Sequence, residues 1–258
     1  MLRRLRKADL KNLKLMFELP NLFRIYPQLN RLVFKKGFLE KADSDFTDLG
    51  LSQIEINNSQ TSINLSKNKV LKSGLYLKLE DEVNCRVVLN LQEYSKTRVF
   101  VIQEKTGNLN LEINLEGREA NVEIHVLSLL GEFSIFNLDT ISNHKSEITT
   151  SKVIVKSVLD DSSKFVFLGR IRIEKHSEKS VASLLNKNII LSDKAKVETM
   201  PELEILASDV KCSHGASVGG ISPEILCYLQ TRGIGPEEAK NLVIQSYISE
   251  IVNLSSFS

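Results

Sequence analysis

Short runs of alternating hydrophobic and polar residues recur between residues 62 and 209. In one run, Leu109, Leu111 and Ile113 alternate with asparagine and glutamate. Alternation with a period of two is typical of a β-strand that buries one face. Similar runs are centred on Leu77, Leu89, Val101, Ile113 and Ile124. The centres lie about a dozen residues apart, so the pattern predicts many short strands separated by turns.

Evenly spaced short strands can build a β-sandwich, a β-barrel or a β-solenoid. Glycine and proline are scarce here, at 12 and 5 residues, and the predicted turns carry asparagine, lysine and serine. Tight hairpins usually need glycine-containing pairs in their turns. The composition of the turns therefore favours a solenoid, while the other two architectures stay open.

Helical spacing appears at both ends of the chain. Near the start, Leu10, Leu13, Met16 and Phe17 recur at helical spacing before a proline. Near the far end, Ser222 precedes a proline and a glutamate, which is typical of a capped helix start, and a second Pro-Glu-Glu start follows at 236–238. We therefore predict an N-terminal helical region over 1–60, a β core over 61–218 and a C-terminal helical region over 219–258.

The overall composition is that of an ordinary globular protein, with 42% hydrophobic and 26% charged residues. A net charge of +2, 6% aromatic residues and no tryptophan argue against a nucleic-acid partner. The longest hydrophobic runs fall well short of the roughly 18 residues that a membrane-spanning helix needs. The basic start lacks the apolar segment of a signal peptide. We expect a cytoplasmic protein without a membrane partner.

The three cysteines show neither CxxC spacing nor an even count, which argues against a zinc knuckle and a disulfide framework. Cys85 and Cys227 lie in apolar segments, so we predict that both belong to the core. Cys212 differs because His214 follows two residues later. On an extended backbone the two side chains point to the same face, with Cα atoms roughly 6 to 7 Å apart. They could share a metal or cluster, or be a buried thiol and a structural histidine.

The other histidines carry weaker predictions. His125 alternates with Ile124 and Val126, so we expect it to face solvent, and His176 lies in a polar stretch that predicts a turn. His144 could simply hold a turn in place.

Ordered motifs follow from His144 to Ile234. They read VLDDS at 158–162, FLGRI at 167–171, NIILS at 188–192, PELEI at 201–205, DVKCSHGA at 209–216 and LQTRGI at 229–234. In this order they resemble the SufB/SufD family, the scaffold subunits of the SUF iron-sulfur cluster assembly machinery. The Cys-Ser-His-Gly at 212–215, and Asn186 where SufB-type chains carry cysteine, are closer to SufD. Leu184 replaces a usual glutamine, and the N-terminal part is short, which leaves room for a reduced system with one scaffold protein.

The resemblance implies a right-handed parallel β-helix with small helical regions at its ends. It also implies a non-catalytic scaffold, and the chain has no GxxxxGK[ST] phosphate-binding loop. ATPase activity would then reside in a SufC-like ABC ATPase that docks on the C-terminal helical region. A second SufB/SufD-like subunit would join through the last strands, as a homodimer or a heterodimer. A cysteine desulfurase or another sulfur donor would be a further partner.

The resemblance further implies a transient iron-sulfur cluster, expected to be 4Fe-4S, that is shared across the dimer. Cys212 and His214 of each subunit would face the dimer axis, and Glu204 is the candidate carboxylate ligand, unless it is a solvated residue or part of an ion pair. One chain has too few cysteines for the four thiolates of a cluster. Two alternatives are a structural partner that holds no metal, and a β-helix enzyme, for which no cluster of basic residues and carboxylates on successive coils gives support.

Overall fold

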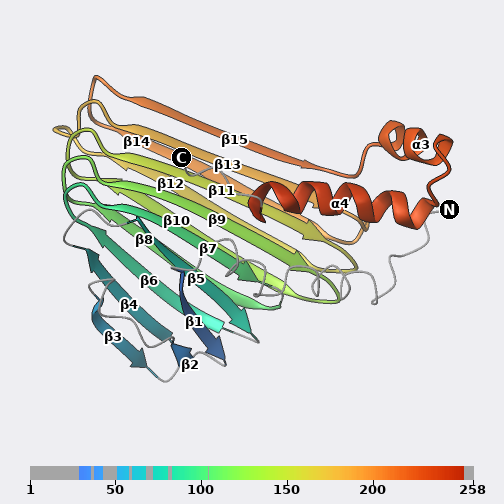
Figure 1. Cartoon of the computed structure of the whole chain (residues 1–258), viewed down its shortest axis with the longest axis horizontal. Helices are drawn as coiled ribbons and strands as arrows, with labels where there is room; N and C mark the ends of the chain where they lie inside the picture. Colours follow the sequence, from blue (N-terminus) through green and yellow to red (C-terminus); the bar gives the residue numbers. More distant parts are fainter. Residues whose placement is uncertain are drawn as a thin grey trace.

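In the computed structural model the chain forms a solenoid whose strands alternate between two facing sheets (Figure 1). The structure describes residues 29–35, 38–42, 51–57, 60–67, 72–80, 83–103 and 105–252. The eight-stranded sheet A has the order β15 (Lys211–Gly219), β13 (Val181–Ile190), β11 (Thr150–Leu159), β9 (Asn121–Leu130), β7 (Lys96–Gln103), β5 (Lys72–Glu80), β1 (Leu29–Lys35), β2 (Phe38–Ala42). The seven-stranded sheet B has the order β14 (Lys196–Ile205), β12 (Lys164–Ile173), β10 (Ile135–His144), β8 (Gly107–Leu115), β6 (Val83–Leu91), β4 (Gln60–Lys67), β3 (Leu51–Asn57).

Neighbouring strands are parallel throughout the coils, and only the pairs β1–β2 and β3–β4 are antiparallel among the described strands. Parallel pairing without a shift stacks equivalent side chains from coil to coil. Val101, Val126 and Val155 are in register and almost fully buried. On sheet B, Phe136 stacks on Phe165 with ring centroids 5.8 Å apart. The two inner faces form the core.

The predicted strands are confirmed. The five expected strand centres fall within consecutive strands from β5 to β9, namely Leu77, Leu89, Val101, Ile113 and Ile124. They point inward where side chains are described, because alternate residues of each strand face the core. Cys85 is also buried as predicted, and burial raises the pKa of its thiol to about 12.

The turns of successive coils lie directly against one another. Gly117, between β8 and β9, donates its backbone N–H to the carbonyl of Leu91 at 3.1 Å. A Cβ atom at Gly117 would lie 1.9 Å from the backbone nitrogen of Glu93, in the turn before β7. This contact between turns therefore needs a glycine.

Two helices follow the last strand, as predicted. Helix α3 (Pro223–Thr231) begins after Ser222, whose hydroxyl accepts the N–H of Ile225, and Gly233 follows it with φ +86°. Helix α4 (Pro236–Val252) crosses the outer face of sheet A (Figure 1). Its buried side chains Ile244, Ile248 and Ile251 pack on residues of β7, β9 and β11: Phe100, Ile102, Leu127, Leu129 and Val158. None of the described helices is long and apolar enough to cross a membrane.

Lys156, a buried lysine of β11, links helix α4 to sheet A. Lys156 is 2% exposed, and its Nζ donates to the carbonyl of Tyr247 at 2.6 Å and lies 4.4 Å from the centre of the Tyr247 ring. The Tyr247 hydroxyl donates to the carbonyl of Lys187 in β13 at 2.5 Å. Helix α4 is therefore an integral part of the solenoid, whereas α3 has no buried residue.

Three expectations from the sequence are wrong. Residues 29–35, 38–42 and 51–57 are strands, not part of an N-terminal helical region, while the helical spacing from Leu10 to Phe17 lies outside the described residues. Cys227 is exposed, because α3 extends away from the core. His125 is fully buried although it points out of sheet A. It stacks on Phe100 at 5.3 Å, and its Nε2 lies 3.1 Å from Glu123 Oε1.

Candidate metal site

Strand β15 carries both Cys212 and His214, and the two side chains point to the inner side of the solenoid. Their neighbours in register on β13 are Ala182 and Leu184, which are buried in the core. In a parallel pair, residues in register point to the same side of the sheet, so Cys212 and His214 continue this inner column. Cys212 is half-buried against the core, and His214 is exposed. The structure thus brings the predicted thiol and imidazole together on one side of one strand.

Polar contacts from the previous coil hold β15 in place. The carboxylate of Glu178 accepts the backbone N–H groups of Ser208 at 3.3 Å and Asp209 at 2.7 Å, in the turn that leads into the strand. From inside the core, Asn188 donates to the carbonyl of Ser217 at 3.0 Å and to the side chain of Asn186 at 2.6 Å. The contacts of Glu178 and Asn188 escaped the sequence interpretation, although amides at two successive inward positions of one strand, Asn186 and Asn188, were a visible signal.

Strands β14 and β15 are the last strands of their sheets among the described residues, and we call them the free edge. Leu203 and Val218 are exposed there, although they occupy inward-facing positions in register with Ile171 and Asn188. Side chains at such positions would be core residues if another coil covered them. A long edge with unpaired backbone groups and exposed hydrophobic side chains is a ready site for pairing with another chain.

Burial raises the pKa of the Cys212 thiol, so in a single chain this cysteine is kept protonated. A metal or cluster would have to displace that proton, because the thiolate is the ligand. Within the described residues, no group of three or more histidine, cysteine, aspartate or glutamate side chains is close enough to hold a metal ion. Among the described residues, Cys212 and His214 are therefore two neighbouring donors without a third close enough to complete a metal site.

Glu204 is not brought together with this pair. It lies on β14, in register with Arg172 on the outer side of sheet B, and its carboxylate is 3.4 Å from the Arg172 guanidinium. Its side chain is 56% exposed. Within one chain, Glu204 points away from the inner side that Cys212 and His214 occupy.

A second polar cluster surrounds His144 and is closed to solvent. His144 Nδ1 is 2.7 Å from Thr149 Oγ1, and Nε2 is 2.8 Å from Ser151 Oγ. Thr149 also contacts the Ser180 hydroxyl on the next coil at 2.8 Å. Burial lowers the pKa of His144 to about 4. With both nitrogens engaged by hydroxyl groups and no exposed surface, the cluster holds coils together.

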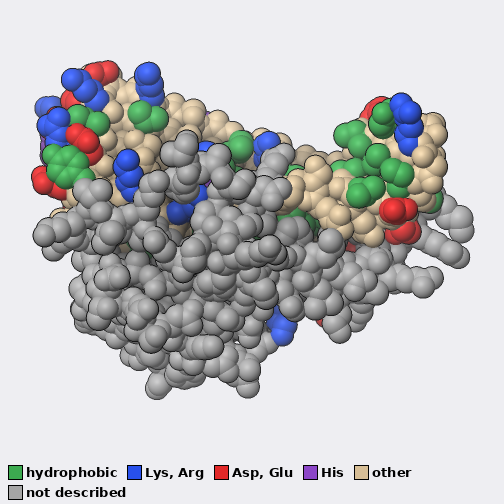
Figure 2. All heavy atoms as spheres, in the orientation of Figure 1, with side chains coloured by type: hydrophobic (Ala, Val, Ile, Leu, Met, Phe, Trp, Pro, Cys, Tyr) green, Lys and Arg blue, Asp and Glu red, His purple; other side chains and the backbone are tan. Residues whose placement is uncertain are grey.

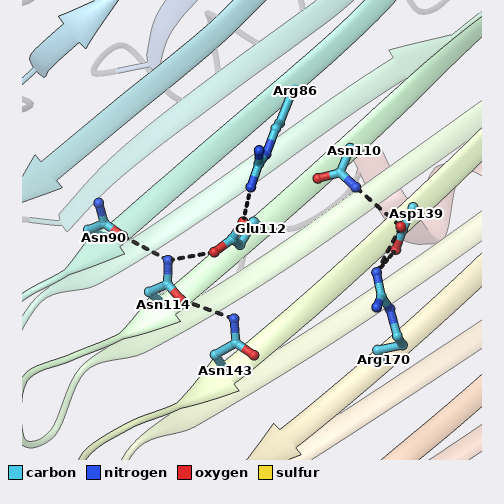
Figure 3. A network of polar contacts seen from close by, with 8 residues as sticks. All are labelled: Arg86, Asn90, Asn110, Glu112, Asn114, Asp139, Asn143 and Arg170. Atoms are coloured by element: carbon cyan, nitrogen blue, oxygen red, sulfur yellow. Dashed lines mark hydrogen bonds and ion pairs between the residues drawn. The ribbon is translucent and has the colours of Figure 1, made fainter.

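The outer face of sheet B carries a network of amides and ion pairs (Figure 3). Asn114 bonds to Asn90 at 2.8 Å and to Asn143 at 3.0 Å, forming a ladder across three strands. Arg170 donates to both carboxylate oxygens of Asp139, at 2.9 and 2.8 Å. These hydrogen bonds and ion pairs connect neighbouring strands of sheet B and so contribute to the stability of the stack.

The fold and the free edge together define a parallel β-solenoid that ends in an apolar edge bearing a thiol and an imidazole. Residues 83–247 match the family model described as SUF system FeS cluster assembly, SufBD core domain. Since the match covers more than half of the chain, the protein belongs to this family of iron-sulfur cluster assembly proteins. The match begins well before His144, where the motifs recognised in the sequence start.

Curated proteins agree with this assignment. The chain is 32% identical to the iron-sulfur cluster assembly protein SufD of Escherichia coli over 142 residues, which are 55% of this chain and 34% of that protein. It is 35% identical to SufD of Bacillus subtilis over 117 residues, 45% of this chain and 27% of that protein. A SufBD family protein of Synechocystis is 30% identical over 151 residues, 58% and 33% of the two chains. The chain thus matches about a third or less of each relative's length.

Proposed function

We propose that this protein is a scaffold subunit that holds an iron-sulfur cluster transiently at the interface between the free edges of two scaffold chains, which we call the seam. The observation that carries the proposal is the position of Cys212 and His214, side by side on the inner face of a strand that no further coil covers among the described residues. Membership of the SufBD core family supports the chemistry. Thiolate and imidazole are both suitable ligands for cluster iron.

The pairing of two β15 strands would have a specific register. Two chains related by a two-fold axis place their β15 strands antiparallel, so that a residue n positions before the axis faces one n positions after it. An axis at Ser213 sets Cys212 opposite His214 of the second chain, at the 4.5 to 5.5 Å Cα separation of directly opposed residues. In a pair of identical chains, two cysteines and two histidines would then surround one point, whereas a related scaffold chain would supply its own donors opposite Cys212 and His214.

This ligand set suits a cluster that the scaffold must later release. Four thiolates are the usual ligands of a stable cluster, and here two imidazoles take the place of two of them. The cluster would be bound by fewer than four thiolates, at an interface between two chains that can separate. Glu204 has no role in this arrangement, because its carboxylate faces the other side of sheet B and pairs with Arg172.

We also propose that an ABC-type ATPase docks on α3. Helix α4 is already packed on sheet A, whereas α3 presents Ile225 and Tyr228 to solvent at 49% and 58% exposure. Figure 2 shows hydrophobic side chains gathered on the surface in the region of α3. This narrows the expected docking region from the whole C-terminal segment to its first helix.

Cys212→Ser should lose most of the cluster, roughly tenfold or more, because changes even one step beyond the direct ligands can cost 10- to 100-fold in metal affinity. The protein would be purified anaerobically together with an ABC-type ATPase and a second scaffold from the same organism. Iron content and visible and Mössbauer spectra would be compared with the wild type. The control is Cys227→Ser, and because this exposed cysteine lies on α3, iron is expressed per scaffold chain and the amount of co-purified ATPase is measured for each variant. Wild-type cluster content in Cys212→Ser would favour the alternative of a structural partner without metal.

The double variant Ile225→Asp, Tyr228→Ala should abolish co-purification of the ATPase. Both side chains are exposed, so the fold should be unaffected, since such surface changes usually alter stability by about 0.5 kcal/mol or less. Gln230→Ala, an exposed polar position on the same helix, is the matched control. Undiminished binding of the ATPase by the double variant would place the docking surface elsewhere.

A further inference from the structure

Glu202 is an unmatched negative charge in the middle of the free edge. It is exposed on the outer side of β14, between two glutamates that each have a cationic partner. Glu198 is 2.7 Å from Lys164, and Glu204 is 3.4 Å from Arg172. The residue in register with Glu202 is Arg170, but Arg170 is turned toward Asp139 (Figure 3). No ion pair involves Glu202 within the part of the chain that the structure describes.

The position of Glu202 relative to the seam follows from the alignment of the two sheets. A Cβ atom at Gly169 would lie 2.5 Å from Leu184 Cδ1, so these two residues face each other across the core. Gly169 is in register with Pro201, and Leu184 is in register with His214. Pro201 therefore lies across from His214. Since β14 and β15 run in opposite directions around one coil, Glu202 lies across from Ser213.

This argument rests on the proposed function, which puts a two-fold axis at Ser213. An axis that relates two β15 strands also relates the two β14 strands, because both belong to the same rigid coil. In a pair of identical chains it would pass close to Glu202 and set this carboxylate directly opposite its own copy. Like charges directly opposite in an antiparallel pair are destabilising, and no basic residue of either chain is free in register to compensate.

We propose that Glu202 selects the partner at the seam. It disfavours pairing with a second copy of this chain and favours a related solenoid chain that places a lysine or arginine opposite β14. The apolar edge residues give affinity to either partner, and the charge decides between them. The partner is thus a scaffold of the same architecture with a basic side chain at the position that corresponds to Glu202.

The experiment compares the full-length wild type with Glu202→Gln and Glu202→Lys. Sedimentation equilibrium should show that Glu202→Gln self-associates about two- to five-fold more tightly than the wild type, the range expected for removing one opposed like-charge pair. The difference should shrink at high salt, since the carboxylates are exposed. Glu93→Gln makes the same charge change on an exposed turn far from the edge and should leave the dissociation constant unchanged.

A mixing experiment tests selection directly. Wild type uniformly labelled with ¹⁵N and unlabelled Glu202→Lys, whose masses are then distinguishable in native mass spectrometry, should form mixed dimers in excess over the statistical share. Statistical mixing together with an unchanged dissociation constant for Glu202→Gln would overturn the role of Glu202 while leaving the cluster site intact. If neither the wild type nor any Glu202 variant forms a dimer, and the cluster does not depend on Cys212, the proposed function itself would be contradicted.

Discussion

His144→Gln is expected to lower the free energy of unfolding by about 2 to 4 kcal/mol at pH 7, because buried hydroxyl groups lose their partners. Both ring nitrogens of His144 contact hydroxyl groups, on Thr149 and Ser151, and the ring is fully buried. Glutamine has similar polarity but cannot place two nitrogen atoms at the same points. The cluster also ties β10 and β11 to the turn before β13, so its loss should loosen two coils together.

The effect of His144 should depend on pH in a defined window. The pKa of His144 is lowered to about 4 in the folded chain and is near 6.5 when unfolded. The folded state favours the neutral ring, so its contribution is complete above pH 6.5 and is lost as the pH falls toward 4. Over that window the stability difference between wild type and His144→Gln should shrink by about 3 kcal/mol.

Urea unfolding followed by circular dichroism at several pH values between 4 and 8 measures this difference. His176→Gln is the control, because His176 is 74% exposed in a turn and its replacement should leave stability unchanged. A stability difference between wild type and His144→Gln that stays constant from pH 7 to pH 4 would show that His144 does not act through its buried neutral ring.

Gly117→Ala is expected to destabilise the protein by about 3 kcal/mol or more, because the added methyl group meets backbone atoms and not a movable side chain. The Cβ would lie 1.9 Å from the nitrogen of Glu93 and 2.4 Å from the carbonyl carbon of Gln92. The two turns would have to separate, which breaks the hydrogen bond from Gly117 N to Leu91. Thermal unfolding should show a clearly lower midpoint.

Gly219→Ala provides the comparison, since a Cβ at Gly219 has nothing within 4 Å. Alanine is favoured over glycine within strands, so this variant should be as stable as the wild type or slightly more so. Equal stability of Gly117→Ala and Gly219→Ala would mean that the turns separate without cost, contrary to the close contact between coils.

The strands from β5 onward could be predicted because each buries one face, and hydrophobic and polar residues therefore alternate along the sequence. Leu109, Leu111 and Ile113 are buried as the alternation required. Residues 29–35, 38–42 and 51–57 were misread because helical spacing upstream of Pro20 was extended over segments that form strands. The choice between sandwich, barrel and solenoid needed the family resemblance, since strand spacing is common to all three.

Side-chain alternation predicts the side of a sheet on which a residue lies, but not which other residues cover that side. His125 points out of sheet A as predicted, yet it is buried against Phe100 and Glu123. Cys227 has an apolar neighbourhood in the sequence, yet α3 buries none of its residues and this cysteine is exposed. The spacing of Cys212 and His214 was sufficient to place both side chains on one side of β15, because two residues along a strand share a side. Within one chain Glu204 lies on the other sheet and on its outer face, away from this pair. The role of all three residues as ligands stays a prediction.

The two ends of the solenoid are unlike, and this limits how large an assembly can grow. At the first coils the antiparallel pairs β1–β2 and β3–β4 interrupt the parallel ladder, and β2 has only five residues. At the last coil the parallel ladder simply stops at β14 and β15. Head-to-tail stacking into a fibre would require the two ends to complement each other, and short edge strands discourage it. In the proposed pairing, two chains that meet through their last coils would use up that surface on both sides, so assembly through this edge would end at two chains.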